Sequence, residues 1–223
     1  MSRDTNVEMT SNITQIKIII VGKSGAGKTS YVNRWIHDTF SESIKPTIVS
    51  ENSSKLYEYK NKLYKINLWD LAGQDHFISL IKTFSKEAQG CITMSDILIK
   101  SKFKDALNWK KALDENQTLP DGSFIPNILI LNKIDLIPNP EENNDFKNAE
   151  EFSKQNKFDA FFKTSVKTGE NINESMDKLL EIVINKLNEI NLDELVEHKN
   201  TLALNPERTS KVDKIRSEQN FCC

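Results

Sequence analysis

Eight consecutive residues near the start of the chain have the types and spacing that bind phosphate. They match the pattern GxxxxGKT and read Gly22-Lys23-Ser24-Gly25-Ala26-Gly27-Lys28-Thr29. Glycines let backbone N–H groups turn inward around phosphate oxygens, and the start of a following helix adds partial positive charge. Lys28 should reach the β- and γ-phosphates, and the Thr29 hydroxyl should bind Mg²⁺. The residues expected to hold the phosphates are Ser24, Gly25, Ala26, Gly27, Lys28, Thr29 and Ser30.

A second group of chemically useful residues ends a predicted strand and reads Asp70-Leu71-Ala72-Gly73-Gln74. The Asp70 carboxylate can hold Mg²⁺ through water, and the Gly73 N–H can approach the γ-phosphate because no side chain intervenes. Gln74 can orient a water molecule for in-line attack. Alone, an Asp and a Gly after a strand more often form a plain turn, but here they accompany a phosphate loop. We therefore predict that Lys28, Gly73 and Gln74 are catalytic.

Two later tetrapeptides predict which base is bound. Asn132-Lys133-Ile134-Asp135 contains a carboxylate, which only accepts hydrogen bonds. Guanine presents two donors on that edge, its N1–H and its amine, whereas adenine presents an acceptor there, and unpaired buried polar groups can reject a wrong ligand by roughly 10⁴-fold. We expect Asn132, Lys133 and Asp135 to bind guanine. In Thr164-Ser165-Val166-Lys167, the backbone of Ser165, Val166 and Lys167 can donate to the guanine oxygen.

The elements around these segments explain how they could meet. Gln15–Val21 is a β-branched run typical of a buried parallel strand, and Thr29–His37 has a helical pattern. Phe40–Ser54 is polar and contains Pro46, which favours a long functional loop. In an open parallel sheet, ligands bind beyond the carboxyl ends of the strands. All four chemical segments are predicted to lie at that edge.

The rest of the chain alternates between strands and helices. Lys55–Lys60 and Leu63–Asp70 form a predicted hairpin around Asn61. Two polar stretches, Gln117–Pro126 and Pro138–Asn148, are predicted loops. We predict an α/β fold, a doubly wound, mostly parallel six-stranded sheet with one antiparallel edge strand and helices on both faces. The further predicted elements are Gly90–Ser95, Lys104–Glu115, Asn127–Leu131, Ala149–Gln155, Ala160–Thr164 and Ile172–Leu187.

Composition limits the class of protein. With 223 residues and 38% hydrophobic residues, the chain can build one sizeable core. We predict a flexible N-terminal extension at residues 1–14, one nucleotide-binding domain at 15–195 and a flexible tail at 196–223. The formal net charge of -2 argues against nucleic acid as a partner. The three cysteines suggest a reducing compartment, and no signal peptide or transmembrane helix is predicted.

From about Gln15 to Leu187, the four segments in this order resemble those of Ras-like small GTPases, and among them the Rab family. Lys45-Pro46-Thr47-Ile48 is similar to the Rab first switch, and the residues from Trp69 to Phe77 are similar to the second. Three stretches resemble the Rab branch of lysosome-related organelles: Glu87–Gly90, Asn108–Asp114 and Leu119–Ser123.

The resemblance implies a GTP/GDP-regulated switch in vesicle trafficking that hydrolyses GTP slowly and recruits effectors in its GTP state. Thr47 would bind Mg²⁺ only with GTP, and Phe40 would pack against guanine. Cys222 and Cys223 would carry geranylgeranyl groups, which fits the rule that stable anchoring takes two signals. The implied partners are effectors, an exchange factor, a GTPase-activating protein and a GDP-dissociation inhibitor. The protein would be a cytoplasmic monomer that cycles to the cytosolic face of endosomal or lysosome-related membranes.

Some residues depart from the family pattern. Asn52 replaces a Phe that, with Trp69 and Phe84, would make an apolar effector surface. Ile44 stands where many relatives keep a Tyr, Val49 begins an atypical stretch, and Val166 replaces the usual Ala. Two alternatives remain: a phosphate-loop kinase, and a module that binds GTP with impaired hydrolysis. The guanine-reading residues and Gln74 argue against the kinase.

Overall fold

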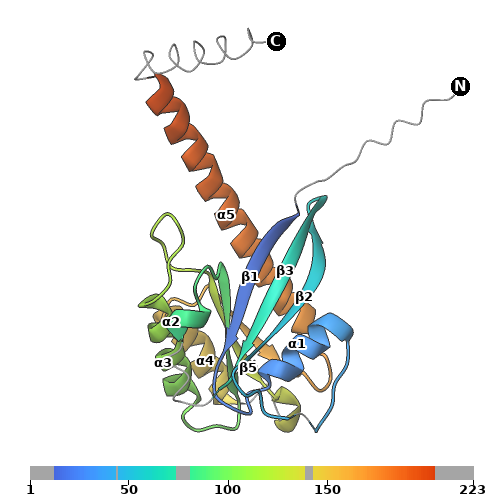
Figure 1. Cartoon of the computed structure of the whole chain (residues 1–223). Helices are drawn as coiled ribbons and strands as arrows, with labels where there is room; N and C mark the ends of the chain where they lie inside the picture. The colour runs from blue at the N-terminus through green and yellow to red at the C-terminus, as the bar shows by residue number, and fades with distance from the viewer. Residues whose placement is uncertain (1–12, 44, 74–80, 139–142, 204–223) are drawn as a thin grey trace, which may run out of the picture. The chain divides into compact units, whose positions relative to one another are not determined.

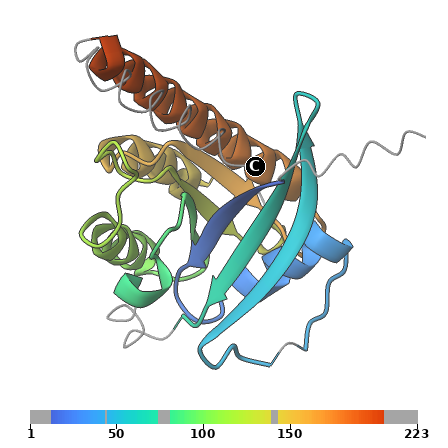
Figure 2. The ribbon, with the colours of Figure 1, turned by 45° about the horizontal axis from the view of Figure 1, so that its top comes forward.

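The computed structural model describes residues 13–43, 45–73, 81–138 and 143–203. Within these residues, one six-stranded sheet has the order β2-β3-β1-β4-β5-β6, and only the β2–β3 pair is antiparallel. Figure 2 shows the twisted sheet with β2 at one edge. The predicted fold is confirmed. The strands are β1 (Thr14–Val21), β2 (Ser50–Tyr59), β3 (Lys62–Leu71), β4 (Gly90–Asp96), β5 (Asn127–Asn132) and β6 (Ala160–Thr164).

Helices cover both faces of the sheet (Figure 1). On one face, Leu129 and Leu131 of β5 belong to apolar clusters with residues of α3 and α4. On the other face, a Cβ atom added at Gly90 of β4 would lie 2.8 Å from Val183 of α5. The helices are α1 (Lys28–His37), α2 (Ile81–Phe84), α3 (Lys102–Asp114), the short 3₁₀ helix η2 (Ile134–Leu136), α4 (Asn144–Gln155) and α5 (Ile172–Ala203).

The central strand β1 is apolar because it is covered on both faces. Ile18, Ile19 and Ile20 are all fully buried, although successive side chains of a strand point to opposite sides.

Between β2 and β3, Lys60 and Asn61 both have positive φ, 49° and 61°, as a two-residue type I′ turn requires. The hairpin predicted around Asn61 is present.

Two predicted loop boundaries are wrong. The loop predicted at Phe40–Ser54 ends earlier, because β2 starts at Ser50 and pairs with Leu71 of β3. These polar residues form a strand because an edge strand needs backbone pairing more than apolar side chains. The loop predicted at Pro138–Asn148 also ends early. Helix α4 begins at Asn144, where the Asn143 side chain accepts a 2.8 Å hydrogen bond from the Asp145 N–H and so caps the helix.

Helix α5 continues past Leu187, where the predicted helix ends, and past residue 196, where the predicted tail begins. The chain divides into two units within this helix, between Val183 and Ile184. Among the described residues, none of the helices combines the length and apolar character needed to cross a bilayer.

Tyr31 connects α1 to the start of α5. Its hydroxyl lies 2.8 Å from Ser175 Oγ and donates to the carbonyl of Ile172 at 3.3 Å, and the side chain is fully buried. We predict that Tyr31→Phe lowers the free energy of unfolding by about 1 kcal/mol, since Ser175 keeps its own bond to Ile172. Urea unfolding of the GDP-saturated protein measures this. Tyr59→Phe, which alters a half-buried tyrosine on β2, is the control, and equal losses in both variants would contradict the prediction.

Candidate functional site

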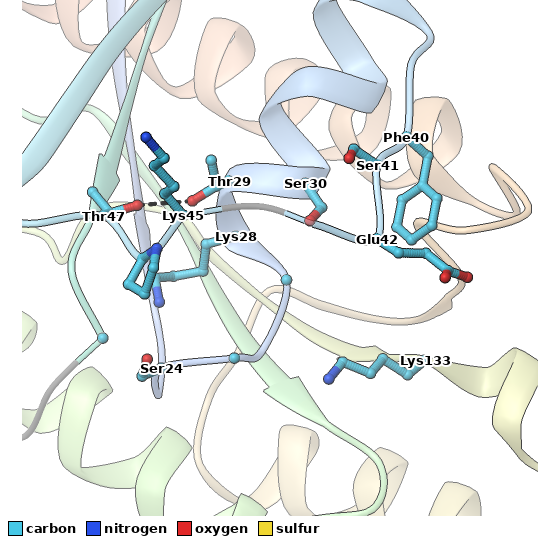
Figure 3. Close-up of a pocket in the computed structure, with 14 residues that line it drawn as sticks. Ser24, Lys28, Thr29, Ser30, Phe40, Ser41, Glu42, Lys45, Thr47 and Lys133 are labelled. Carbon is cyan, nitrogen blue, oxygen red and sulfur yellow. Dashed lines mark hydrogen bonds between the residues drawn. The ribbon is translucent and has the colours of Figure 1, made fainter.

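A cavity of about 390 Å³ lies at the carboxyl end of the sheet. Figure 3 shows Lys28, Thr29 and Thr47 on one side of it, and Phe40 and Lys133 on the other. The structure therefore brings the predicted phosphate segment and the predicted base segment to one space. The lining residues are Ser24, Gly25, Gly27, Lys28, Thr29, Ser30, Phe40, Ser41, Glu42, Lys45, Pro46, Thr47, Gly73 and Lys133.

The phosphate loop depends on glycine at the start of α1. Gly27 has φ 100°, in the left-handed region, and an added Cβ atom would lie 2.4 Å from the Asn132 side chain. Directly after it, the Lys28 ammonium donates to the carbonyls of Gly22 at 2.9 Å and Lys23 at 3.2 Å. Burial lowers the pKa of Lys28 to about 8, while the nearby Asp70 carboxylate opposes this shift. A phosphate group would supply the negative charge that this buried ammonium lacks.

Three oxygen-bearing side chains gather beside the phosphate loop. Asp70 Oδ2 accepts hydrogen bonds from the hydroxyls of Thr29 and, at 3.0 Å, Thr47, and the two hydroxyls lie 2.9 Å apart. The other oxygen, Asp70 Oδ1, is buried and has no hydrogen-bond partner among the described residues. Burial raises the pKa of this carboxyl, against the hydrogen bonds that lower it. An unpaired buried oxygen among hydroxyls fits a hard divalent cation such as Mg²⁺.

Gly73 packs directly on the phosphate loop. Its carbonyl accepts a 2.7 Å hydrogen bond from the Ser24 N–H, and an added Cβ atom would lie 2.4 Å from the Ser24 nitrogen. Only glycine permits this approach of the β3 end to the loop. The next predicted residue, Gln74, lies outside the described residues, as do Ile44, Cys222 and Cys223.

At the base end, the buried Asn132 amide joins three segments. Its Nδ2 donates to the Ala26 carbonyl at 2.9 Å, and its Oδ1 accepts from Thr164 Oγ1 at 3.1 Å and from the Val166 N–H at 3.2 Å. This amide thus holds the phosphate loop against the end of β6. Nearby, the exposed Asp135 carboxylate accepts a 2.6 Å hydrogen bond from Ser165 Oγ. Asp135 and Ser165 do not line the cavity themselves, whereas Lys133 of the same tetrapeptide as Asp135 does.

Comparison with known proteins agrees with this geometry. The model of the Ras family matches residues 17–185. Rab-7L1 of Rattus norvegicus is 35% identical over 174 residues, which cover 78% of this chain and 84% of that protein. Rab-32 of Homo sapiens is 33% identical over 204 residues, covering 91% and 83%. Rab-32C of Dictyostelium discoideum is 33% identical over 172 residues, covering 76% and 73%.

The chain belongs to the Rab family of Ras-like small GTPases. It is therefore a trafficking GTPase that binds guanine nucleotides, as the sequence predicts, and the reading as a module with impaired hydrolysis is not favoured.

Sequence reasoning missed several residues around the site of this Rab-family GTPase. Asp96, at the carboxyl end of β4, forms a 2.7 Å ion pair with Lys133. The rule that ligand sites lie at the ends of parallel strands could have indicated it. Glu42 lines the cavity and pairs with Lys167 at 3.1 Å, and Arg34 of α1 donates to the carbonyls of Val166 and Lys167. No local pattern marks Glu42 or Arg34.

The lowered pKa of Lys28 predicts a proton linked to nucleotide binding. At pH 9 the Lys28 side chain of the ligand-free Rab-family GTPase is mostly neutral, because its pKa is about 8. Bound phosphate should restore the charge, so GDP binding at pH 9 should take up close to one proton. Calorimetry in buffers of different ionisation enthalpy measures the uptake. Lys28→Arg, which stays charged, should take up none, and equal uptake in both proteins would contradict the prediction.

The same shift sets a pH dependence of stability. In the unfolded chain, Lys28 has its ordinary pKa of 10.5. Between about pH 8 and 10.5 the unfolded chain therefore binds one more proton than the folded chain. The burial of this ammonium therefore destabilises the ligand-free fold below pH 8, and the penalty is relieved as the pH rises toward 10.5.

Proposed function

We propose that this chain binds GTP together with Mg²⁺, hydrolyses it slowly, and recruits effectors in the GTP state at the cytosolic face of endosomal or lysosome-related membranes. The observation that carries the proposal is the position of Thr47. This residue of the first switch lies beside Thr29 of the phosphate loop and Asp70 of the second-switch strand. A switch residue is thus within reach of the same ion as two fixed ligands.

Magnesium would be held by the Thr29 and Thr47 hydroxyls and by Asp70, the last through water. The ion would supply positive charge that offsets the negative charge developing on the phosphates. The unpaired Asp70 Oδ1 supports this assignment, since a coordinated water would give it a donor. Loss of the γ-phosphate would release Thr47 but leave Thr29 and Asp70 in place, and this difference is the switch.

Hydrolysis would use three groups of the chain. The Lys28 ammonium would bind the β- and γ-phosphates, the Gly73 N–H would donate to the γ-phosphate, and the Gln74 amide would orient the attacking water. The Gly73 carbonyl accepts a 2.7 Å hydrogen bond from the Ser24 N–H of the phosphate loop, and this proximity supports the role of Gly73. Since no arginine is present in the first switch, intrinsic turnover should be slow, and a GTPase-activating protein could accelerate it by up to about 10⁵-fold.

Guanine would be recognised by hydrogen bonds at one end and by packing. The Asp135 carboxylate, oriented by Ser165 Oγ, would accept from N1–H and the amine, and the Lys167 N–H would donate to the guanine oxygen, since the Val166 N–H already donates to Asn132 Oδ1. Phe40, which lines the cavity and is 37% exposed, would pack on the base. Lys133 lines the cavity as well, and Asp96 holds its side chain.

Membrane attachment would come from geranylgeranyl groups on Cys222 and Cys223. Two chains satisfy the two-signal rule that one chain does not. The monomeric protein would then need a GDP-dissociation inhibitor to shield the lipids in the cytoplasm, and an exchange factor to load GTP at the membrane. The Rab names of the relatives support the role in trafficking on which this cycle depends.

The guanine assignment is tested by Asp135→Asn. The new amide would offer a donor where guanine also has donors, so we expect the affinity for GDP to fall by at least about 100-fold. Xanthosine diphosphate, which carries a carbonyl in place of the guanine amine, should bind the variant better than GDP does. Titration with fluorescent nucleotides measures both affinities.

Glu150→Gln, which removes an exposed carboxylate paired with Lys154, is the control for the Asp135 experiment. Wild-type protein that bound ADP as tightly as GDP would refute guanine recognition, and so would an Asp135→Asn variant with unchanged preference.

The switch assignment is tested by Thr47→Ala. Loss of this hydroxyl should weaken Mg²⁺-dependent binding of a non-hydrolysable GTP analogue by about tenfold and leave GDP affinity within about twofold. Thr29→Ala, which removes a ligand used in both states, should weaken both nucleotides. Equal effects of Thr47→Ala on the GTP analogue and GDP would contradict a state-specific role.

A further inference from the structure

One guanidinium group joins the loop at Val166 and Lys167 to the C-terminal end of α1. Arg34 Nε donates to the Val166 carbonyl at 3.0 Å, and Nη2 donates to the Lys167 carbonyl at 2.7 Å. Nη1 donates to the backbone carbonyl of Asp38 at 3.1 Å and to its Oδ1 at 3.2 Å. The side chain is only 16% exposed. Nothing in the mechanism above uses this residue, although its charge is directed almost entirely at backbone oxygens.

The acceptors belong to the two segments that approach the base. Val166 and Lys167 form the loop that would face the guanine oxygen. Asp38 ends α1 with φ 52°, in the left-handed region, and Phe40 of the cavity wall follows two residues later. Arg34 therefore sets the base loop against the start of the Phe40 segment. The planar fork of Arg, with donors in fixed directions, can make these bonds at once, whereas the single ammonium of Lys cannot.

Because of peptide geometry, the carbonyls that Arg34 fixes determine the direction of the N–H groups that follow them. In a planar trans peptide, the N–H of a residue points opposite to the carbonyl of the residue before it. A Val166 carbonyl fixed toward Arg34 therefore turns the Lys167 N–H away from Arg34. Likewise, the fixed Lys167 carbonyl orients the Thr168 N–H, which donates to Ser165 Oγ at 3.1 Å. Ser165 Oγ in turn donates to Asp135 Oδ1 at 2.6 Å.

We propose that Arg34 is a positioning residue for guanine recognition. It orients the Lys167 N–H toward the guanine oxygen and, through Thr168 and Ser165, the Asp135 carboxylate toward the guanine donors, and it thereby slows nucleotide release. This inference rests on the proposed base assignment. It adds a residue of α1, outside all four nucleotide-binding segments, to the determinants of base specificity.

The test uses the full chain and three variants. Arg34→Gln removes the charge and the fork, Arg34→Lys keeps the charge but loses the fork, and Lys154→Gln removes an exposed cation that is paired with Glu150. Release of fluorescent GDP should be about tenfold faster in Arg34→Gln, since several charge-assisted hydrogen bonds are lost. Arg34→Lys should also release GDP several-fold faster, and Lys154→Gln should match the wild type.

A second readout separates positioning from general loosening. In 6-thio-GDP, sulfur replaces the guanine oxygen and accepts hydrogen bonds weakly, so the wild type should bind it more weakly than GDP. In Arg34→Gln the ratio of the affinity for GDP to that for 6-thio-GDP should fall toward one, because the misplaced loop no longer donates a well-aligned hydrogen bond to the guanine oxygen. Thermal unfolding with saturating GDP checks that each variant is folded. If Arg34→Gln does not fold, the same measurements on Arg34→Lys test the proposal.

Three results would overturn the inference. Unchanged GDP release in Arg34→Gln would show that the loop holds itself, and the proposed function would stand if the wild type still prefers GDP to ADP. Faster release with an unchanged preference for GDP over 6-thio-GDP would reduce Arg34 to a structural part. Wild-type release rates in Arg34→Lys would assign the effect to charge alone. A wild type without preference for guanine would instead refute the base assignment itself.

Discussion

Two opposite charges are buried together at the phosphate end of the cavity, and the rest of the site depends on how they are neutralised. Lys28 is 6% exposed and Asp70 is 2% exposed. Burial lowers the pKa of Lys28 and raises the pKa of Asp70, and the charge of each residue partly offsets the shift of the other. Lys28 donates to loop carbonyls, and one Asp70 oxygen has no partner among the described residues. An anion beside Lys28 and a cation beside Asp70 would each offset the cost of burying these groups.

That constraint explains why the first switch can report the nucleotide. In the proposed role, Thr47 would be a third oxygen at the ion beside Thr29 and Asp70, so its contact with the ion would depend on what the buried pair binds. Its segment is also connected to the second-switch strand, since the Ala72 N–H donates to the Val49 carbonyl at 2.9 Å. In the proposed switch, a change at the γ-phosphate would therefore act on the ends of β2 and β3 at the same time.

The base end uses neutral and backbone groups instead of a buried charge pair. The Asn132 amide forms hydrogen bonds with the phosphate loop and with the end of β6, and the Arg34 guanidinium donates to backbone carbonyls. Hydrogen-bonded groups held in this way are pre-organised, so a base can be read without ordering the loop on binding. The two ends are coupled at Gly27, where the Asn132 side chain leaves no room for a Cβ atom.

Much of the fold and the site could be predicted because the decisive signals are local. The Gly22–Thr29 loop, the apolar run of β1 and the strand ends carry their chemistry in a few adjacent residues. The early start of β2 escaped prediction because Ser50–Ser54 are ordered by pairing with β3, which lies distant in sequence. Arg34 escaped for the same reason: besides the nearby Asp38, its acceptors are the carbonyls of Val166 and Lys167, more than 130 residues away, and nothing next to Arg34 in the chain reveals them.

The separation of these signals also explains how partner choice can vary while the chemistry is kept. Asn52, where related switches place a Phe, pairs in register with Trp69, and Lys17 lies over the Trp69 ring at 4.6 Å. These side chains lie on one face of β1, β2 and β3, which is made polar here. The nucleotide is bound at the strand ends, so substitutions on this face leave Lys28, Asp70 and Asn132 untouched. Because the Val49 carbonyl, two residues after Thr47, is bonded to the Ala72 N–H at the end of this hairpin, the proposed switch would still connect the γ-phosphate to an effector bound on this face.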